Sequence, residues 1–497
     1  MKTKILRNSS VALLAQFVAI IYGFVLPRMI LGHFGSEING LTQSIKQFLG
    51  VIGFLDMGVG QVVRSALYRP LADKDHLQLS RVMASGTKFY RRLAYMMIAY
   101  VAILMCVYPY VAEQNFGWLY TATLIAAMAI SSFAQYYFGI TNEQLLHADQ
   151  CGYIIYSLQI ISYLLNLAAC VWMINVGCSI QQVKLAASLI FLIRPLVIQI
   201  YIQRHYQIDR KIRYTSEPIA QKWNGVAQHV SAVVLDGTDT IVLTLMSTLS
   251  NVSVYSVYYM VITSLQQFYQ STTAGIQSAA GALWAKQDAE EIGRMFSQVE
   301  FLLHSAVVFM FSCAGMLIVP FVRVYTYGLS DANYIQPLFA ALLVIAYGIR
   351  SLRTPYNIWI LAAGHYKQTQ VCHITAAAIN LIISVFAVSQ WGLVGVAVGT
   401  LIAMVYQTLW MAVYCYKNLI NRSLNKLAKQ CFIDILSAGF VCLLSFKMDI
   451  RQINYWSWIL MAVKVAAISL VTMAFVVFIF RREYFLKAWR HFDIRKS

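Results

Sequence analysis

Basic side chains interrupt several long apolar stretches of this sequence. Hydrocarbon cannot solvate a charge, so an ionisable group at membrane depth faces protein, water or a ligand. Arginine suits phosphate, because its planar guanidinium group donates two parallel hydrogen bonds. The candidate substrate-binding residues for an anion are Lys46, Arg64, Arg194, Arg350, Arg353 and Arg28.

The surroundings of these cations separate them into two groups. Arg194, Arg350 and Arg353 each lie shortly before a proline. Proline leaves a helix carbonyl without its hydrogen-bond partner and often kinks the helix, so these arginines are the strongest ligand candidates. Arg28 and Arg64 lie near the ends of apolar stretches, where extension of the side chain to the lipid surface explains them equally well.

Glycines lie between two of the cations. At 100° per residue, Gly50, Gly53 and Gly60 fall within about 40° of the line that joins Lys46 and Arg64. The stripe indicates either a cavity wall with room for a bulky headgroup or a packing face of small residues between helices.

Acids within apolar stretches are candidates for ion coupling. Asp236 shares a helical stripe with His229, and Asp239 lies one turn away. A helix with two central acids seldom faces lipid, so the pair indicates a proton or sodium site, substrate contact or an internal ion pair. Asp56, beside the glycine stripe, is a third candidate and a possible counter-ion. The next stretch adds the neutral groups that a sugar path needs: Ser256, Thr263, Gln267 and Gln270.

The elements that must position these residues are apolar helices. A run of about 20 apolar residues is long enough to cross the hydrocarbon core. The sequence predicts an all-α polytopic membrane protein with fourteen transmembrane helices. Their ranges are 8–31, 40–67, 90–111, 118–141, 152–175, 182–203, 223–247, 253–281, 298–325, 335–361, 369–389, 393–416, 429–446 and 456–480.

The positive charge supports this count of spans. Most of the 38 Lys and Arg residues fall on one side if the spans alternate, in the termini and in the loops after even-numbered spans. The positive-inside rule then places both termini in the cytoplasm. The net charge of +18 is scattered over short loops, so we expect it to meet anionic lipid rather than nucleic acid.

Composition excludes other classes of protein. A hydrophobic share of 59% with 12% charged residues is not that of an ordinary soluble domain. The loops are too short for a catalytic domain, so we expect no enzyme activity. The nine Cys form no CxxC pair or His/Cys cluster, and we expect neither a metal site nor a cofactor.

A weak internal repeat predicts the domain organisation. The segment SALYRPLADKDHLQLSRVM resembles SAAGALWAKQDAEEIGRMF six spans later. An even offset gives both copies the same orientation, as in transporters built from parallel repeats. We expect an N-lobe over 1–206, a C-lobe over 221–416 and an appended helix pair over 429–481.

Three segments carry a family resemblance. These are GSEINGLTQSIKQFLGVIGFLDMGVGQVVRSALYRPLADKD, VLDGTDTIVLTLMSTLSNVSVYSVYYMV and YGIRSLRTPYNIWILAAGHYKQTQ with the following WGLVGVAVGTLIA. They resemble polysaccharide transporter family flippases (Wzx-like), in the superfamily of multidrug extruders and the lipid II flippase. The resemblance implies two six-helix lobes around a central cavity. It also implies transport of undecaprenyl-diphosphate-linked oligosaccharide across the bacterial cytoplasmic membrane, for O-antigen, capsule or exopolysaccharide.

Two alternatives stay open at this point. A cation-coupled multidrug extruder has the same fold, but intramembrane bases outnumber acids here. A membrane-embedded enzyme of polysaccharide assembly would need a larger loop or domain. A lipid-linked cargo, membrane lipid, a proton or sodium ion, and other polysaccharide assembly proteins are the expected partners.

The charge asymmetry predicts a testable topology. Alkaline phosphatase fused after Asn175, in an outer loop, should be active, because the enzyme matures only outside the cytoplasm. Fused after Ser497 it should be inactive. The reverse pattern of activities would show that the assignment of sides is wrong.

Overall fold

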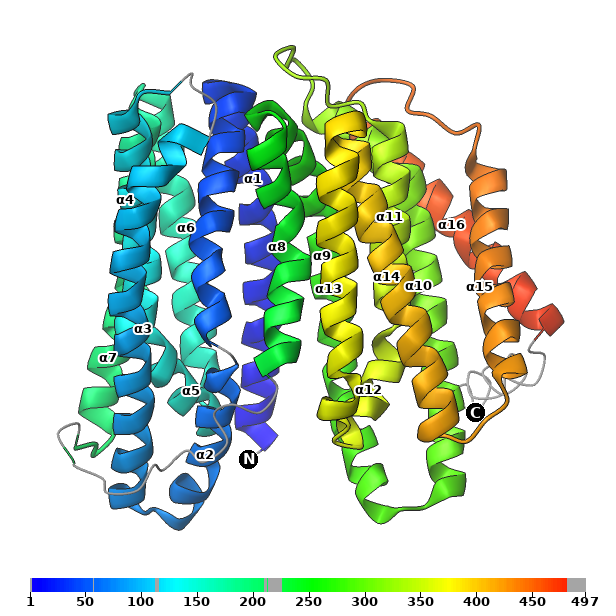
Figure 1. The fold of residues 1–497 in the computed structure, drawn as a ribbon, viewed down its shortest axis with the longest axis horizontal. Helices are drawn as coiled ribbons and strands as arrows, with labels where there is room; N and C mark the ends of the chain where they lie inside the picture. Colours follow the sequence, from blue (N-terminus) through cyan, green and yellow to red (C-terminus); the bar gives the residue numbers. More distant parts are fainter. Residues whose placement is uncertain (1, 57, 112–115, 210–211, 213–225, 481–497) are drawn as a thin grey trace. The chain divides into compact units, whose positions relative to one another are not determined.

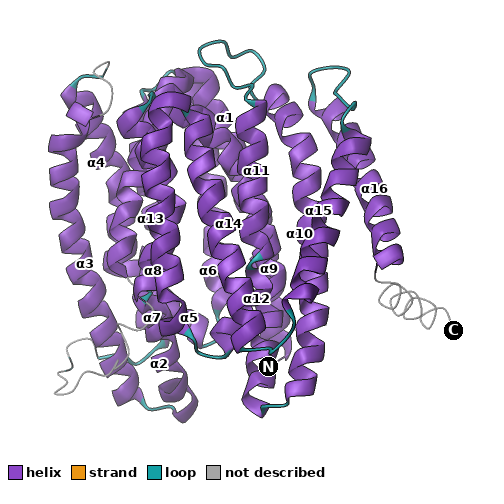
Figure 2. Cartoon of the chain, turned by 45° about the vertical axis from the view of Figure 1, so that its right-hand side comes forward, coloured by secondary structure: helices purple, strands orange, loops and turns teal. Residues whose placement is uncertain are grey.

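The computed structural model describes residues 2–56, 58–111, 116–209, 212 and 226–480. The described residues form helices joined by short loops, without a strand (Figure 2). The basic loop around 210–222 and the basic tail after 480 lie outside the described residues or largely so, as does residue 481 of the predicted helix pair. The chain divides into two compact units, unit 1 (Met1–Ser253) and unit 2 (Val254–Ser497).

Unit 1 contains the first eight α-helices, a 3-10 segment and a π segment (Figure 1). The elements are α1 (Lys2–Gly50), η1 (Val51–Asp56), α2 (Val59–Asp73), α3 (His76–Val111), α4 (Trp118–Ala134), η2 (Gln135–Gly139), α5 (Ile140–Ala148), α6 (Gly152–Asn175), α7 (Ile180–His205) and α8 (Val226–Met246). Helix α1 packs on α6, α4 on α7, and α2 on α5.

Unit 2 begins within α9 (Leu249–Lys286) and contains the remaining helices. These are α10 (Ala289–Tyr325), α11 (Pro337–Leu352), α12 (Thr354–Ala362), α13 (Tyr366–Trp391), α14 (Leu393–Asn418), α15 (Leu424–Ser445) and α16 (Tyr455–Phe480). Helix α14 packs on α11 and α13, and α10 packs on α11, α15 and α16.

Most of the predicted spans lie within single helices. The range 152–175 is that of α6, and 456–480 differs from α16 by one residue. Eleven helical segments of the described residues are long and apolar enough to cross a membrane. The polar helices α8 and α9 are outside that set. The chain is an all-helical, multi-span membrane protein, as predicted.

Two predicted spans are not continuous helices, 40–67 and 335–361, and the second is divided between α11 and α12. The range 40–67 is divided among the end of α1, the 3-10 segment η1 and α2. Gly58, with φ 73°, precedes α2 in the left-handed region that favours glycine. A rotation of 100° per residue therefore does not continue from Lys46 to Arg64, and the regular stripe predicted between them is wrong.

The division into lobes stays a prediction. Within unit 1, buried polar contacts join α8 to α1, since the Ser44 and Thr244 hydroxyls lie 2.7 Å apart. The Asn39 amide of α1 also donates to Ser253 Oγ, at the start of α9, over 2.7 Å. The Ser44–Thr244 contact accounts for the position of α8 in unit 1, whereas the sequence repeat would begin a second lobe with this helix.

Small residues allow α13 and α14 to pack closely. A methyl group on Gly399 would lie 2.8 Å from the backbone nitrogen of Ser384 and 3.1 Å from the Asn380 carbonyl oxygen. The Asn380 amide donates to Thr400 Oγ1 across the same contact over 3.0 Å. Close helix contacts of this kind are typical of membrane helices, which lack a hydrophobic driving force for association.

We expect Gly399→Ala to lower the free energy of unfolding by about 1–3 kcal/mol, because backbone atoms cannot move aside as a flexible side chain can. Gly439→Ala on α15 is the control, because nothing lies within 4 Å of the added methyl group. Thermal unfolding in detergent measures both. Equal midpoints would show that the α13–α14 contact tolerates a methyl group.

Candidate functional site

A short helix in unit 1 contacts two of the predicted cations. Helix α5 follows the π segment η2, and such single-turn π segments often occur at functional sites. Arg64 of α2 donates from Nε to Gln144 Oε1 over 2.8 Å. Arg194 of α7 forms an ion pair with Glu143, with 2.6 Å between Nη2 and Oε1. Helix α5 thus brings Arg64 and Arg194 together.

Further polar groups surround this helix. His147 of α5 lies within electrostatic range of both Arg64 and Arg194. The Tyr90 hydroxyl of α3 donates to Asp56 Oδ1 over 2.6 Å. Side-chain atoms of Tyr90 and Gln144 lie 3.1 and 3.2 Å from where a methyl group on Gly60 would be. The space beside Gly60 is therefore filled by protein, which favours the packing-face alternative at this glycine.

Open space lies beside the other two glycines of the predicted stripe. Nothing lies within 4 Å of a methyl group built on Gly50, and the nearest atom to one on Gly53 is the Tyr136 hydroxyl at 4.0 Å. Lys46 is exposed there, in electrostatic range of Lys184 on α7. Arg28 lies further along α1, half-buried, with Nη1 close to Gly32.

The predicted coupling acids of α8 differ in exposure. Asp239 is 1% exposed, whereas Asp236 is half-buried. Both make interactions within the protein. Gly237, between them, lies against Gln47 of α1. The side chain of His229 lies outside the described residues, so its predicted stripe with Asp236 stays a prediction.

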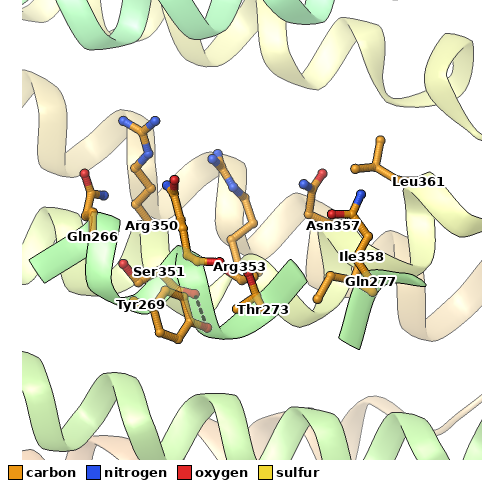
Figure 3. A pocket seen from close by; sticks show the side chains of 12 residues that line it. Gln266, Tyr269, Thr273, Gln277, Arg350, Ser351, Arg353, Asn357, Ile358 and Leu361 are labelled. Carbon is orange, nitrogen blue, oxygen red and sulfur yellow. Dashed lines mark hydrogen bonds between the residues drawn. The ribbon is translucent and has the colours of Figure 1, made fainter. Parts of the chain in front are cut away.

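Unit 2 contains a polar pocket of about 330 Å³ that includes the other two predicted arginines. Arg350 and Arg353 lie at the junction where α11 ends and α12 begins, and Pro355 in the first turn of α12 accounts for the break. Figure 3 shows both arginine side chains extending to the same side of this junction. The pocket volume is within the range of small-molecule sites.

Neutral side chains complete the pocket. Helix α9 contributes amides and hydroxyls, and α11 and α12 contribute the rest. The lining residues besides the arginines are Gln266, Tyr269, Gln270, Thr273, Gln277, Ser351, Thr354, Asn357, Ile358 and Leu361. Of the four predicted sugar-path residues, Gln270 lines the pocket and the other three do not. Two guanidinium groups among neutral donors and acceptors can bind an anion that carries hydroxyl groups.

Another basic residue in a predicted span has a structural partner. Arg323 Nη1 lies 3.0 Å from Asp449 Oδ2, in the loop before α16. Partial burial alone would raise the pKa of Asp449, but the hydrogen bonds from Arg323 and the Ile450 amide outweigh it and lower the pKa. The interaction anchors this loop to the end of α10.

Sequence reasoning missed Glu143, Gln144 and the buried acids of unit 2. Glu143 lies two residues beyond the predicted span 118–141, so hydropathy does not place it among the intramembrane acids. The spacing of Glu143 and His147 is the signal that could have found it, since residues four apart share one helix face. Among the described residues no group of three or more His, Cys, Asp or Glu is arranged to hold a metal ion.

Comparison with known proteins gives structural relatives only. No protein-family model and no curated protein matches the chain. The lipid II flippase MurJ, in an inward closed conformation, matches with a TM-score of 0.70 and 12% identity over 95% of this chain and 99% of that one. An inward-facing multidrug resistance MATE family transporter matches with a TM-score of 0.61 and 13% identity, over 83% of this chain and 98% of that one.

A third relative is a MOP superfamily transporter from Pyrococcus furiosus, with a TM-score of 0.60 and 14% identity over 85% of this chain and 97% of that one. The binding pocket of that transporter has reverse polarity, which suggests a different function for it. These structural neighbours are transporters rather than enzymes. At such identities the likeness concerns the fold, and this chain has the fold of the MOP superfamily.

The Arg194–Glu143 pair allows a structural role to be separated from ligand binding. We expect Arg194→Ala to lower the free energy of unfolding by about 3 kcal/mol, because it leaves the largely buried Glu143 carboxylate without its partner. Adding Glu143→Gln should recover part of that loss. The measurement is a double-mutant cycle by denaturant unfolding in mixed micelles. Strictly additive losses would show that the two side chains are not energetically coupled.

Proposed function

We propose that this chain is a flippase that moves undecaprenyl-diphosphate-linked oligosaccharide from the inner to the outer leaflet of the bacterial cytoplasmic membrane. The product would supply a surface polysaccharide such as O-antigen, capsule or exopolysaccharide. The observation that carries the proposal is the pocket in unit 2, where Arg350 and Arg353 face neutral amides and hydroxyls.

The chemistry of the pocket matches that of the cargo headgroup. A diphosphate offers several acceptor oxygens to the arginine forks, and a sugar both donates and accepts hydrogen bonds. Among the described residues that line the pocket there is no Asp or Glu. A pocket for the cationic cargo of a multidrug extruder would favour acids at these positions, so we place that function second.

Arg64, Arg194, Lys46 and Arg28 are proposed to assist from unit 1. Their surroundings make them weaker candidates, because Arg194 is paired with Glu143 and Arg64 with Gln144. Lys46, which is exposed, is the strongest of these four for headgroup contact. Asp56, Asp236 and Asp239 remain proposed ion-coupling residues, since the sequence contains no GxxxxGK[ST] loop for nucleotide-driven transport.

Binding of undecaprenyl diphosphate to the protein in lipid nanodiscs tests the pocket. We expect Arg350→Ala and Arg353→Ala each to weaken binding about tenfold or more, since a hydrogen bond to a charged group contributes about 1.5–3 kcal/mol. Lysine at either position should restore only part of the affinity, because it cannot form the bidentate contact.

Two controls make the result specific. Arg294→Ala removes an exposed arginine that pairs with Glu290 on α10, and it should leave binding unchanged. Undecaprenol, which has no phosphate, should bind every variant alike. Unaltered binding of undecaprenyl diphosphate to both alanine variants would contradict the role of the pocket. Binding of an organic cation instead would favour the extruder.

A further inference from the structure

Three ionisable side chains are buried together in unit 2, away from the pocket. Glu300 and His304 lie one turn apart on α10, and Asp434 faces them from α15. Their exposed fractions are 4%, 1% and 6%. We call them the Glu300–His304–Asp434 cluster. None of the three lines the pocket, and none is among the site residues predicted from the sequence.

A chain of short contacts connects the cluster. His304 Nδ1 lies 2.6 Å from Asp434 Oδ2, and His304 Nε2 lies 3.2 Å from the Tyr356 hydroxyl. The Tyr356 hydroxyl is also 3.0 Å from Glu300 Oε1. Tyr416 donates to the Glu300 carboxylate over 2.9 Å, and the Gln430 amide donates to Asp434 Oδ1 over 2.9 Å. A continuous hydrogen-bond path thus runs from Asp434 through His304 and Tyr356 to Glu300, with one acid at each end.

The Tyr356 hydroxyl has only one proton to donate, and this limits the protonation states that the path can adopt. With Nδ1–H donated to Asp434, a neutral His304 needs a donor at Nε2, and an ionised Glu300 also needs the Tyr356 proton. One hydroxyl proton cannot serve both groups. If the cluster holds one more proton, the conflict disappears, because Tyr356 then donates to one neighbour and accepts from the other.

Two arrangements of that extra proton are equivalent in charge. In one, His304 is an imidazolium that donates from Nε2 to Tyr356, and Tyr356 donates to the Glu300 carboxylate. In the other, Nε2–H has passed its proton to the Tyr356 oxygen while the hydroxyl proton has moved to Glu300 Oε1. The cluster of three carries a charge of −1 in both, and of −2 when the proton leaves.

The surrounding groups favour the arrangement in which the extra proton is on His304 and Glu300 is ionised. Arg422, in the loop between α14 and α15, is within electrostatic range of Glu300 and donates to Ser297 and to the Gly293 carbonyl. The Leu352 carbonyl at the end of α11 lies close to the His304 ring, and it favours the imidazolium arrangement, in which both ring nitrogens carry a hydrogen. The other titratable groups that interact with Glu300 are Cys415 and Tyr416 of α14 and Cys431 of α15. Helix α16, which packs on α10 and α15, carries Lys464, which is exposed.

Helix α12 connects the cluster to the pocket. Tyr356 of α12 belongs to the hydrogen-bond path, whereas Thr354 and Asn357 of the same short helix line the pocket. Leu352, whose carbonyl contacts His304, lies between the lining residues Ser351 and Arg353. A change of hydrogen bonding at Tyr356 therefore acts on a helix of nine residues that contributes to the pocket.

We propose that the Glu300–His304–Asp434 cluster is a proton-binding site that holds one exchangeable proton, and that its occupancy is coupled through α12 to ligand binding in the pocket. The coupling rests on the proposed function, whereas the proton site does not. Coupling of this kind is reciprocal, so cargo binding changes proton affinity by the same factor as the proton changes cargo affinity.

Infrared difference spectra of the full-length protein in lipid, recorded across alkaline pH steps, test the proton site. The wild type should lose the signal of a protonated carboxyl or imidazolium group, and Glu300→Gln and His304→Gln should each change it. Tyr356→Phe should shift the titration to lower pH by about one unit, because the protonated cluster loses one more hydrogen bond than the deprotonated one. Because Tyr356→Phe removes only a hydroxyl group, we expect it to fold. It therefore still tests the proton site if the other variants do not fold.

Glu291→Gln, an exposed acid on the same helix, is the matched control and should leave the spectra unchanged. A titration that is the same in the wild type, Glu300→Gln and Tyr356→Phe would overturn the proton site. So would a signal that follows sodium concentration at constant pH, which would make sodium the ligand.

Binding of undecaprenyl diphosphate at two pH values tests the coupling. Between the two pH values, the affinity of the wild type and of Glu291→Gln should change by a factor about fivefold or more larger than that of Glu300→Gln. A factor of this size is within the usual range of allosteric coupling. Titration of the diphosphate itself affects all variants alike. Equal pH dependence in the three proteins would overturn the coupling. Failure of the wild type to bind the probe would contradict the proposed function, and with it the coupling, but leave the infrared result intact.

Discussion

Charge within hydrocarbon is the constraint on which the rest of this structure depends. Because lipid offers no hydrogen bonds, each ionisable group must find protein partners or water, and irregular backbone is tolerated only where protein or a cavity surrounds it. The chain meets both demands at the same places. Helix α5 follows a π segment and contacts two arginines, and α12 follows a proline break with Arg350 and Arg353 beside it. Breaks in the long helices and charged side chains therefore occur together.

Hydropathy predicted the helices well because length and apolar composition decide whether a segment can cross a membrane. It predicted α6 to the residue, yet it treated 40–67 as a single helix. The break there depends on a 3-10 segment and on the positive φ of Gly58, and the hydropathy profile indicates neither of them. The sequence likewise gives no indication of the π segment before α5. Pro355 did mark the break before α12, since proline cannot donate the hydrogen bond that would continue a helix.

The candidate cations were also visible in the sequence, because a base in an apolar run has few explanations. Their partners were not. Glu143 lay just outside a predicted span, and Asp434 is 130 residues from the histidine that it contacts. Spacing of four residues on one helix, as for Glu300 and His304, places two polar groups on one face but does not say what that face meets. Only the packing of α10 against α15 supplies that information.

The distribution of charge around α12 has a consequence for mechanism under the proposed function. The pocket on one part of this helix presents arginines, and the cluster that contacts Tyr356 presents buried acids. An anionic cargo and a proton would thereby be bound by separate groups and would not compete for the same atoms. Coupling between them must then pass through the helix rather than through shared ligands. A helix of nine residues, preceded by a proline break, is a small element that a single hydrogen-bond change can reposition, which long membrane helices packed along their whole length resist.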